Sequence, residues 1–140
     1  MSARTAAETA VGDAFGPVTV PVRRETLVAY ADASGDQNPI HQDEQFARSV
    51  GLPDVIAHGM WTLGAAGSAV AEWAGGADRV LELGTRFTKP VVVPSGGAEV
   101  VIAGVVKTLD TESGRATVDV SVTADGAKVL GRCTAVVQLA

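Results

Sequence analysis

Residues 59–74 read GMWTLGAAGSAVAEWA, an almost unbroken apolar run around which the rest of the chain has to fold. Only Thr62, Ser68 and Glu72 in it are polar, so the helix that the pattern predicts has apolar side chains on nearly every side. A helix of this kind has to be covered by other elements. Trp61 and Trp73 within it are expected in the core or at an interface.

The residues after this helix change to a β-rich character. Segments at about 79–93, 98–109, 115–124 and 127–139 favour strands, separated by turn formers such as Ser113-Gly114 and Asp125-Gly126. In the third segment valines alternate with polar residues, which is typical of an antiparallel sheet with one buried face. Long strands and one apolar helix are both satisfied when the sheet curls around the helix. The sequence therefore predicts an α+β hot-dog fold, with residues 1–140 as a single domain.

The residues before the helix predict a second, more irregular layer. A strand over 17–22 leads into a helix over 23–33, and turn formers then place residues 35–42 in a loop. Asp43 is expected to cap a short helix that runs to Ser49, and a further loop leads to His58.

Composition excludes several classes of function. The 140-residue chain carries a net charge of -5 without any run of Lys and Arg, which disfavours nucleic-acid binding. Residues 1–10 lack the pattern of a secretory leader and no stretch is long enough to cross a bilayer, so a cytoplasmic protein without membrane contact is expected. The single cysteine, Cys133, is predicted to be a packing residue, and no cysteine or histidine cluster offers zinc-ligand spacing, so no metal is expected.

The loop SGDQNPIH at 34–41 holds the candidate chemistry. Asp36 and His41 lie five residues apart across a bend at Pro39, so both side chains can point into one cavity and hold a single water. An imidazole with an ordinary pKa near 6.5 can accept or donate a proton at neutral pH. Turn chemistry alone also selects Asp and Asn in such a loop, so the spacing by itself leaves open that His41 is only a surface residue.

A longer motif favours a catalytic role for Asp36 and His41. Tyr30, the loop SGDxNPIH and Ala47 resemble the signature of the MaoC-like (R)-specific enoyl-CoA hydratases, the hydratase 2 family, with Gln37 at its variable position. The likeness continues through AHGM at 57–60 and RFTxPV at 86–91. In this wider pattern the chain most resembles the catalytic subunits of mycobacterial (3R)-hydroxyacyl-ACP dehydratases.

The resemblance implies a role for each site residue. Asp36 and His41 would be the catalytic pair, and the amide of Gly59 would donate to the thioester oxygen. Independently of the resemblance, an amide in the first turn of a helix lacks an intrahelical partner and favours negative charge. Asn38 and His58 are interpreted as support for the loop and for the helix terminus.

The implied activity is the reversible, syn addition of water to trans-2-enoyl thioesters, giving the 3R alcohol, in fatty-acid metabolism. Coenzyme A (CoA) or acyl carrier protein would carry the substrate, with no cofactor or metal. A homodimer is expected, and a heterodimer with this chain as the catalytic half is the alternative partner state. A hot-dog thioesterase and a non-catalytic subunit are the alternative functions. The basic side chains of Arg86, Lys89, Lys107 and Arg132 are interpreted as solvated or ion-paired.

Overall fold

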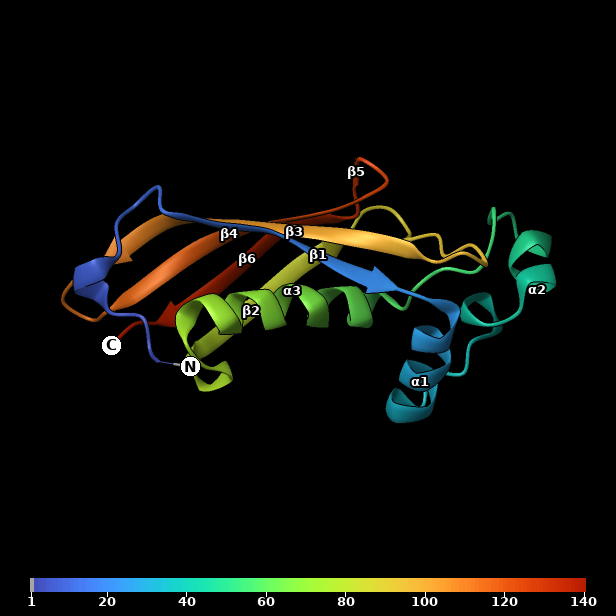
Figure 1. Ribbon diagram of the computed structural model, residues 1–140, viewed down its shortest axis with the longest axis horizontal. Helices are drawn as coiled ribbons and strands as arrows, with labels where there is room; N and C mark the ends of the chain where they lie inside the picture. Colours follow the sequence, from blue (N-terminus) through green and yellow to red (C-terminus); the bar gives the residue numbers. More distant parts are fainter. Residues whose placement is uncertain (1) are drawn as a thin grey trace.

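One antiparallel sheet dominates the computed structural model, which describes residues 2–140 (Figure 1). Its strand order is β1-β3-β4-β6-β2, and the short β5 pairs with β4. The strands are β1 (Ala14–Val22), β2 (Val80–Phe87), β3 (Ala98–Asp110), β4 (Arg115–Ala124), β5 (Ala127–Lys128) and β6 (Leu130–Gln138). The two edges of the sheet are therefore β1 and β2.

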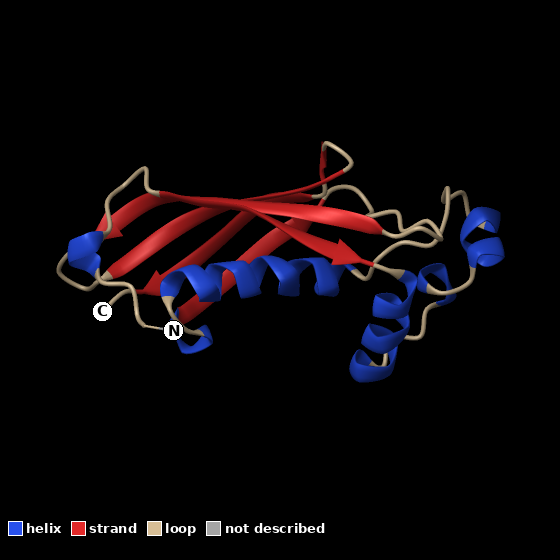
Figure 2. Cartoon of the chain, viewed as in Figure 1, coloured by secondary structure: helices blue, strands red, loops and turns tan. Residues whose placement is uncertain are grey.

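The helices lie on one side of the sheet and beyond its two ends (Figure 2). They are η1 (Ala6–Glu8), α1 (Arg24–Ser34), η2 (Pro39–His41), α2 (Glu44–Ser49), α3 (Gly59–Ala74) and η3 (Ala77–Arg79). The long helix α3 runs along the sheet, whereas α1 and α2 lie together past one end of it. No helix in residues 2–140 is both long enough and apolar enough to cross a membrane.

Helix α3 buries one stripe against the sheet and exposes the opposite one. The buried stripe is spaced by four residues and consists of Thr62, Ala66, Val70 and Ala74. The stripe at 60, 64, 68 and 72 stays exposed in the single chain. Small side chains let the helix approach closely: a Cβ on Gly67 would come within 2.9 Å of Leu83 on β2.

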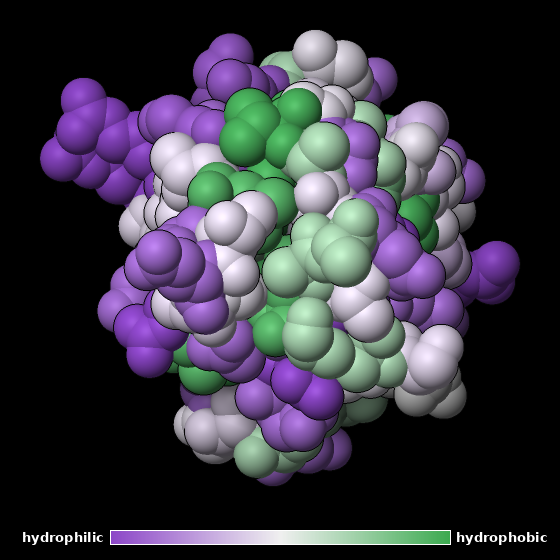
Figure 3. All heavy atoms as spheres, turned by 90° about the vertical axis from the view of Figure 1, so that its left-hand side faces the viewer, coloured by the Kyte–Doolittle hydropathy of each residue, from purple (hydrophilic) through white to green (hydrophobic). Residues whose placement is uncertain are grey.

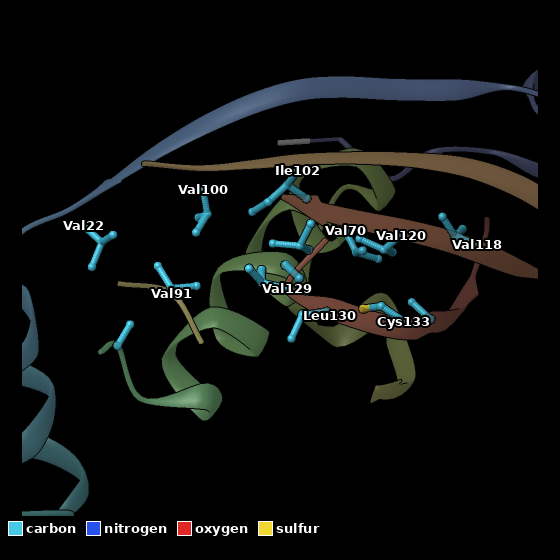
Figure 4. Close-up of a cluster of buried hydrophobic side chains, with 14 of the residues drawn as sticks. Val22, Val70, Val91, Val100, Ile102, Val118, Val120, Val129, Leu130 and Cys133 are labelled. Atoms are coloured by element: carbon cyan, nitrogen blue, oxygen red, sulfur yellow. The ribbon is translucent and has the colours of Figure 1, made fainter. Parts of the chain in front are cut away.

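The core lies between α3 and the sheet (Figure 4). Val70 of the helix and Val100, Ile102, Val118 and Val122 of the strands are all 0 % exposed. Alternating valines of β4 therefore point inward, as the sequence pattern predicts. The predicted α+β hot-dog fold is confirmed.

The expectation of one strand over 79–93 is wrong. Strand β2 ends at Phe87, and the chain then leaves β6 because Pro90 and Pro94 cannot donate to a ladder. Residues 91–93 pair instead with residues 55–57: the amide of Ala57 donates to Val91 and that of Val93 donates to Val55. This second pairing holds the segment before α3 beside the end of β2.

The two chain ends meet at the other end of the molecule. Backbone hydrogen bonds join Arg4 to Ala74 and to Ala140, and the Arg4 guanidinium lies 4.7 Å from the ring centre of Trp73. Phe15 stacks on the same indole at 5.6 Å. The tryptophan therefore packs at the edge of the core, as expected for it. Figure 3 shows this end as a mixed surface, with apolar atoms gathered in the middle and hydrophilic atoms around them.

Candidate active site

A cavity of about 530 Å³ opens where the end of α1, the loop after it, η2 and the start of α3 meet the end of β2. It brings together residues that are far apart in the sequence. Its lining includes Tyr30, Ser34, Asp36, His41, Ile56, His58, Gly59, Met60, Phe87, Lys89 and Leu130. Asp36, His41, His58 and Gly59, which the sequence singles out, all face this one space.

Local hydrogen bonds fix the loop that holds Asp36. Helix α1 ends at Gly35, whose φ of 81° is a left-handed conformation that glycine adopts without strain. The Asp36 carboxylate accepts from the amide of Asn38 at 3.1 Å through Oδ1, and the Asn38 side chain accepts from the amide of Ile40 at 3.1 Å. Asn38 thereby caps η2, and its side chain is turned to the loop. The second carboxylate oxygen, Oδ2, is left to face His41.

The His41 ring is held in one tautomer. Its Nδ1 lies 2.6 Å from the carbonyl oxygen of Ile56, and since a carbonyl only accepts, Nδ1 carries the proton. Nε2 therefore presents a lone pair, 4.0 Å from Oδ2 of Asp36. Burial lowers the pKa of His41 below 6.5, and the nearby His58 lowers it further, while the bond to Ile56 and the charge of Asp36 oppose the change. At neutral pH, His41 is set up to accept a proton at Nε2.

His58 contacts both Asp36 and His41 from the buried side of the cavity. It is 1 % exposed, and its ring stacks on that of His41 with centres 3.8 Å apart and an angle of 22° between the planes. Its Nε2 donates to the backbone carbonyl of Asp36 at 3.1 Å. The Tyr30 ring packs against the His58 ring with centres 4.8 Å apart and the planes tilted by 53°.

Gly59 begins α3 immediately after His58. Its amide has no acceptor among residues 2–140, whereas the amides of Trp61 and Thr62 both donate to the His58 carbonyl. The 16-residue helix behind it concentrates positive partial charge at this end. A Cβ at position 59 would come within 2.8 Å of the Phe87 ring, so only glycine leaves that ring where it lies.

The clustering of the two histidines was not expected from their positions in the sequence. One candidate donor atom from each of Asp36, His41 and His58 lies within 4.8 Å of the others, which is compatible with metal-ligand spacing. A metal bound to an imidazole lies in the plane of the ring, and two nearly parallel rings share no in-plane point close to both. The stacked arrangement therefore does not fit a shared ion.

Three contributors to the site were missed by sequence reasoning. The carbonyl of Ile56 has no side-chain signal, and Phe87 and Lys89 reach the cavity only because β2 ends beside it.

Other residues considered from the sequence lie outside this cavity. Lys107 lies 4.0 Å from Asp119 on another part of the sheet and lines a separate hollow together with Arg132. Cys133 is buried, with a pKa raised by burial, as expected of a packing residue.

The fold and the cavity define a hot-dog protein with a carboxylate and an imidazole poised over one helix terminus. The family model described as "MaoC like domain" matches residues 6–125, and the chain belongs to this family. It is 44 % identical over 77 residues to 3-hydroxyacyl-thioester dehydratase Y of Mycobacterium tuberculosis, a match that covers 53 % of the chain and 26 % of that protein.

Two solved structures extend the likeness over the whole fold. A MaoC-like dehydratase superposes with a TM-score of 0.96 at 35 % identity, covering 99 % of this chain and 43 % of that one. An (R)-hydratase of A. caviae involved in PHA biosynthesis superposes with a TM-score of 0.84 at 26 % identity, covering 94 % and 98 %. The chain thus spans about a quarter of the mycobacterial relative and under half of the first structure.

Proposed function

We propose that the protein catalyses the reversible hydration of trans-2-enoyl thioesters to (3R)-3-hydroxyacyl thioesters. The observation that carries this proposal is the Nε2 of His41 lying 4.0 Å from Oδ2 of Asp36, in one cavity with the free amide of Gly59. The similarity to an (R)-hydratase and to a 3-hydroxyacyl-thioester dehydratase supports it.

The geometry supports a mechanism with a single water. A water within hydrogen-bond reach, about 2.8 Å, of two acceptors 4.0 Å apart sees them at nearly a right angle, close to the angle between its own O–H bonds. The Asp36 carboxylate and the His41 Nε2 each accept one of its hydrogens. The water oxygen bonds to C3, and the proton taken up by the pair is delivered to C2. Because both groups lie on one side of the planar enoyl unit, the addition is syn.

Gly59 completes the proposed site by stabilising the thioester. When oxygen adds to C3, the C2=C3 electrons move toward the thioester oxygen until C2 takes up its proton. A fixed amide aimed at that oxygen lowers the barrier by several kcal/mol. The position of this amide relative to Asp36 and His41 selects the face of the alkene, and the 3R product is the one that the related (R)-hydratase indicates.

We propose that the reaction uses no metal or redox cofactor, and that CoA or acyl carrier protein serves only to carry the acyl group. The near-parallel rings of His41 and His58 support this, because they suit a stack better than a shared ion. The apolar cavity walls from Ile56, Phe87 and Leu130 suit an acyl chain.

The two sheet edges support a dimer formed through β2. Strand β1 contains Pro17 and Pro21 and a register shift between Phe15 and Val18, features that hinder the addition of a further strand. Strand β2 contains no proline and exposes Leu81 and Phe87, which are 45 % and 56 % exposed. A second copy of this chain on β2 would cover Phe87 beside the cavity. A heterodimer using the same edge is the alternative.

The test is to incubate the purified protein with crotonyl-CoA and, separately, with saturated acyl-CoA. Loss of the enone absorbance is expected with the first substrate and no thiol release with the second. In D₂O, dehydrogenases specific for each alcohol and NMR at C2 should report a 3R product of syn addition. Thiol release without hydration would instead support the thioesterase, and a 3S product would contradict the proposed stereochemistry.

A further inference from the structure

His58 touches all the parts that the proposed reaction needs, although no step of that reaction uses it. Its backbone carbonyl accepts from the amides of Trp61 and Thr62 at 3.0 and 3.2 Å, so it closes the first turn of α3 beside Gly59. Its ring supports His41 from below at 3.8 Å. Its Nε2 lies 3.1 Å from the carbonyl oxygen of Asp36, 22 positions earlier in the chain.

The bond to Asp36 also determines where the proton of the ring lies. The carbonyl oxygen can only accept, so the proton is on Nε2. Nδ1 is then a lone pair, and it is the one buried side-chain nitrogen or oxygen in residues 2–140 that has no hydrogen-bond partner. A proton moved to Nδ1 would have no acceptor there and would remove the donor from Asp36, at the cost of leaving buried polar groups unpaired.

We propose that His58, with its proton on Nε2, is the positioning residue that sets the distances among the Asp36 carboxylate, the His41 imidazole and the Gly59 amide. This inference rests on the proposed function. One rigid side chain links the loop to the helix terminus. The other side-chain bonds of the loop, from Gln37 to Asp32 and from Gln42 to Gln37, are exposed, and the Asp36 carboxylate itself accepts only from the amide of Asn38. That carboxylate is 53 % exposed, so packing alone does not hold it.

Two substitutions separate the two contacts of this ring. His58→Gln keeps an N–H donor at about the position of Nε2 but removes the stacking surface. His58→Phe keeps a flat ring against His41 but removes the donor. If the hydrogen bond positions Asp36, His58→Phe should lower kcat by roughly 10²-fold with a KM within about threefold of the wild type, since small misplacements of reacting groups cost about that much. His58→Gln should recover at least tenfold of this loss.

Val70→Ala is the matched control for lost stability, because Val70 is fully buried on the same helix and lies outside the cavity lining. It should lower Tm and leave kcat within about twofold. Equal kcat values for His58→Phe and wild type, or no recovery in His58→Gln, would overturn the proposal. A loss in His58→Gln as large as in Asp36→Asn would make His58 a participant in proton transfer and would also overturn it.

An NMR measurement tests the positioning role without any substrate. Ring ¹⁵N shifts of the wild-type protein should show His58 protonated at Nε2, and hydrogen exchange of the Asp36–Asn38 amides should become faster in His58→Phe but stay near the wild-type rate in His58→Gln. A proton on Nδ1 would refute the assignment. If the wild type fails to hydrate any enoyl thioester, the proposed function fails, whereas the NMR result still decides whether His58 orders this loop.

Discussion

In this cavity the tautomer of each histidine is determined by the backbone carbonyl to which its ring donates a hydrogen bond. The Nδ1 of His41 is paired with Ile56 at 2.6 Å, and the Nε2 of His58 is paired with Asp36 at 3.1 Å. The same residue type therefore presents a lone pair to the cavity in one case and a donor to the loop in the other. Chemical roles at this scale follow from the backbone around each ring.

Substitution of either member of the pair should affect turnover far more than folding. Asp36→Asn and His41→Gln keep the approximate shape while removing proton transfer, and each should lower kcat by roughly 10²- to 10⁴-fold. The double variant should lose far less than the product of the two, because in the proposed mechanism both groups act on one water. Steady-state kinetics with crotonyl-CoA measures this, and fully multiplicative losses would contradict the single-water mechanism.

The pH dependence should reflect the lowered pKa of His41. With burial as the main cause, the proton-accepting form persists below pH 6.5 in the folded protein. The plot of kcat/KM against pH should therefore fall on the acid side only below 6.5. An unfolded histidine takes up its proton at higher pH, so the contribution of His41 to stability should decrease as pH falls through 6.5. An NMR titration of His41 with a midpoint above 6.5 would contradict both expectations.

The elements around the cavity are tied together by one guanidinium. Arg24, at the start of α1, reaches Glu44 of α2 at 3.0 Å, Asp54 before α3 at 2.7 Å, and the Val93 carbonyl at 3.2 Å. These contacts join four segments that the sheet itself does not hold. The α1–α2 layer is thus held by these polar contacts as well as by the buried side chains of Leu27 and Ala47.

Arg24→Met should destabilise the protein by roughly 1–3 kcal/mol, because Asp54 has a side chain only 12 % exposed and would lose its nearest partner. Arg48→Met is the control: Arg48 contacts the same two acids but is 58 % exposed, so roughly 0–1 kcal/mol is expected. Urea unfolding followed by circular dichroism gives both values. An equal loss of unfolding free energy in both variants would show that Arg24 contributes no more to stability than the exposed Arg48.

At the scale of the whole molecule, the sheet has an unpaired edge at β2. Strand β2 has no neighbour on its outer side, and Leu81 and Phe87 on it are exposed in the single chain. Apolar side chains at such an edge are usually covered in soluble proteins. The proposed dimer through β2 accounts for this free edge.

Leu81→Lys should therefore weaken the dimer, since it places a charge on the unpaired edge strand. Val105→Lys is a matched control, because Val105 is exposed to a similar extent, 46 % against 45 %, but lies on β3, which has a neighbour on each side. Light scattering should show a shift toward monomer in the first variant only. Unchanged dimers in both variants would place the interface elsewhere.

Much of this protein follows from short stretches of its sequence. The apolar run predicts the helix at 59–74, which α3 matches at both ends, and the alternating valines predict β4 and its buried face. Asp43 caps α2 through the amide of Phe46, as expected from its position. Such features depend on neighbours within a few residues, so the local sequence contains their cause. The long SGDxNPIH motif likewise located Asp36 and His41 in one loop.

The contacts of those residues, in contrast, depend on how distant segments of the chain pack together. The pairing of residues 91–93 with 55–57 follows the end of β2 and holds the Ile56 carbonyl beside His41. The stack of His41 on His58 joins two loops that are separated by α2. A backbone carbonyl has no side-chain identity, and contacts between distant segments depend on how the sheet and helices pack. Residue types therefore determined which groups were available, while packing determined their tautomers, partners and distances.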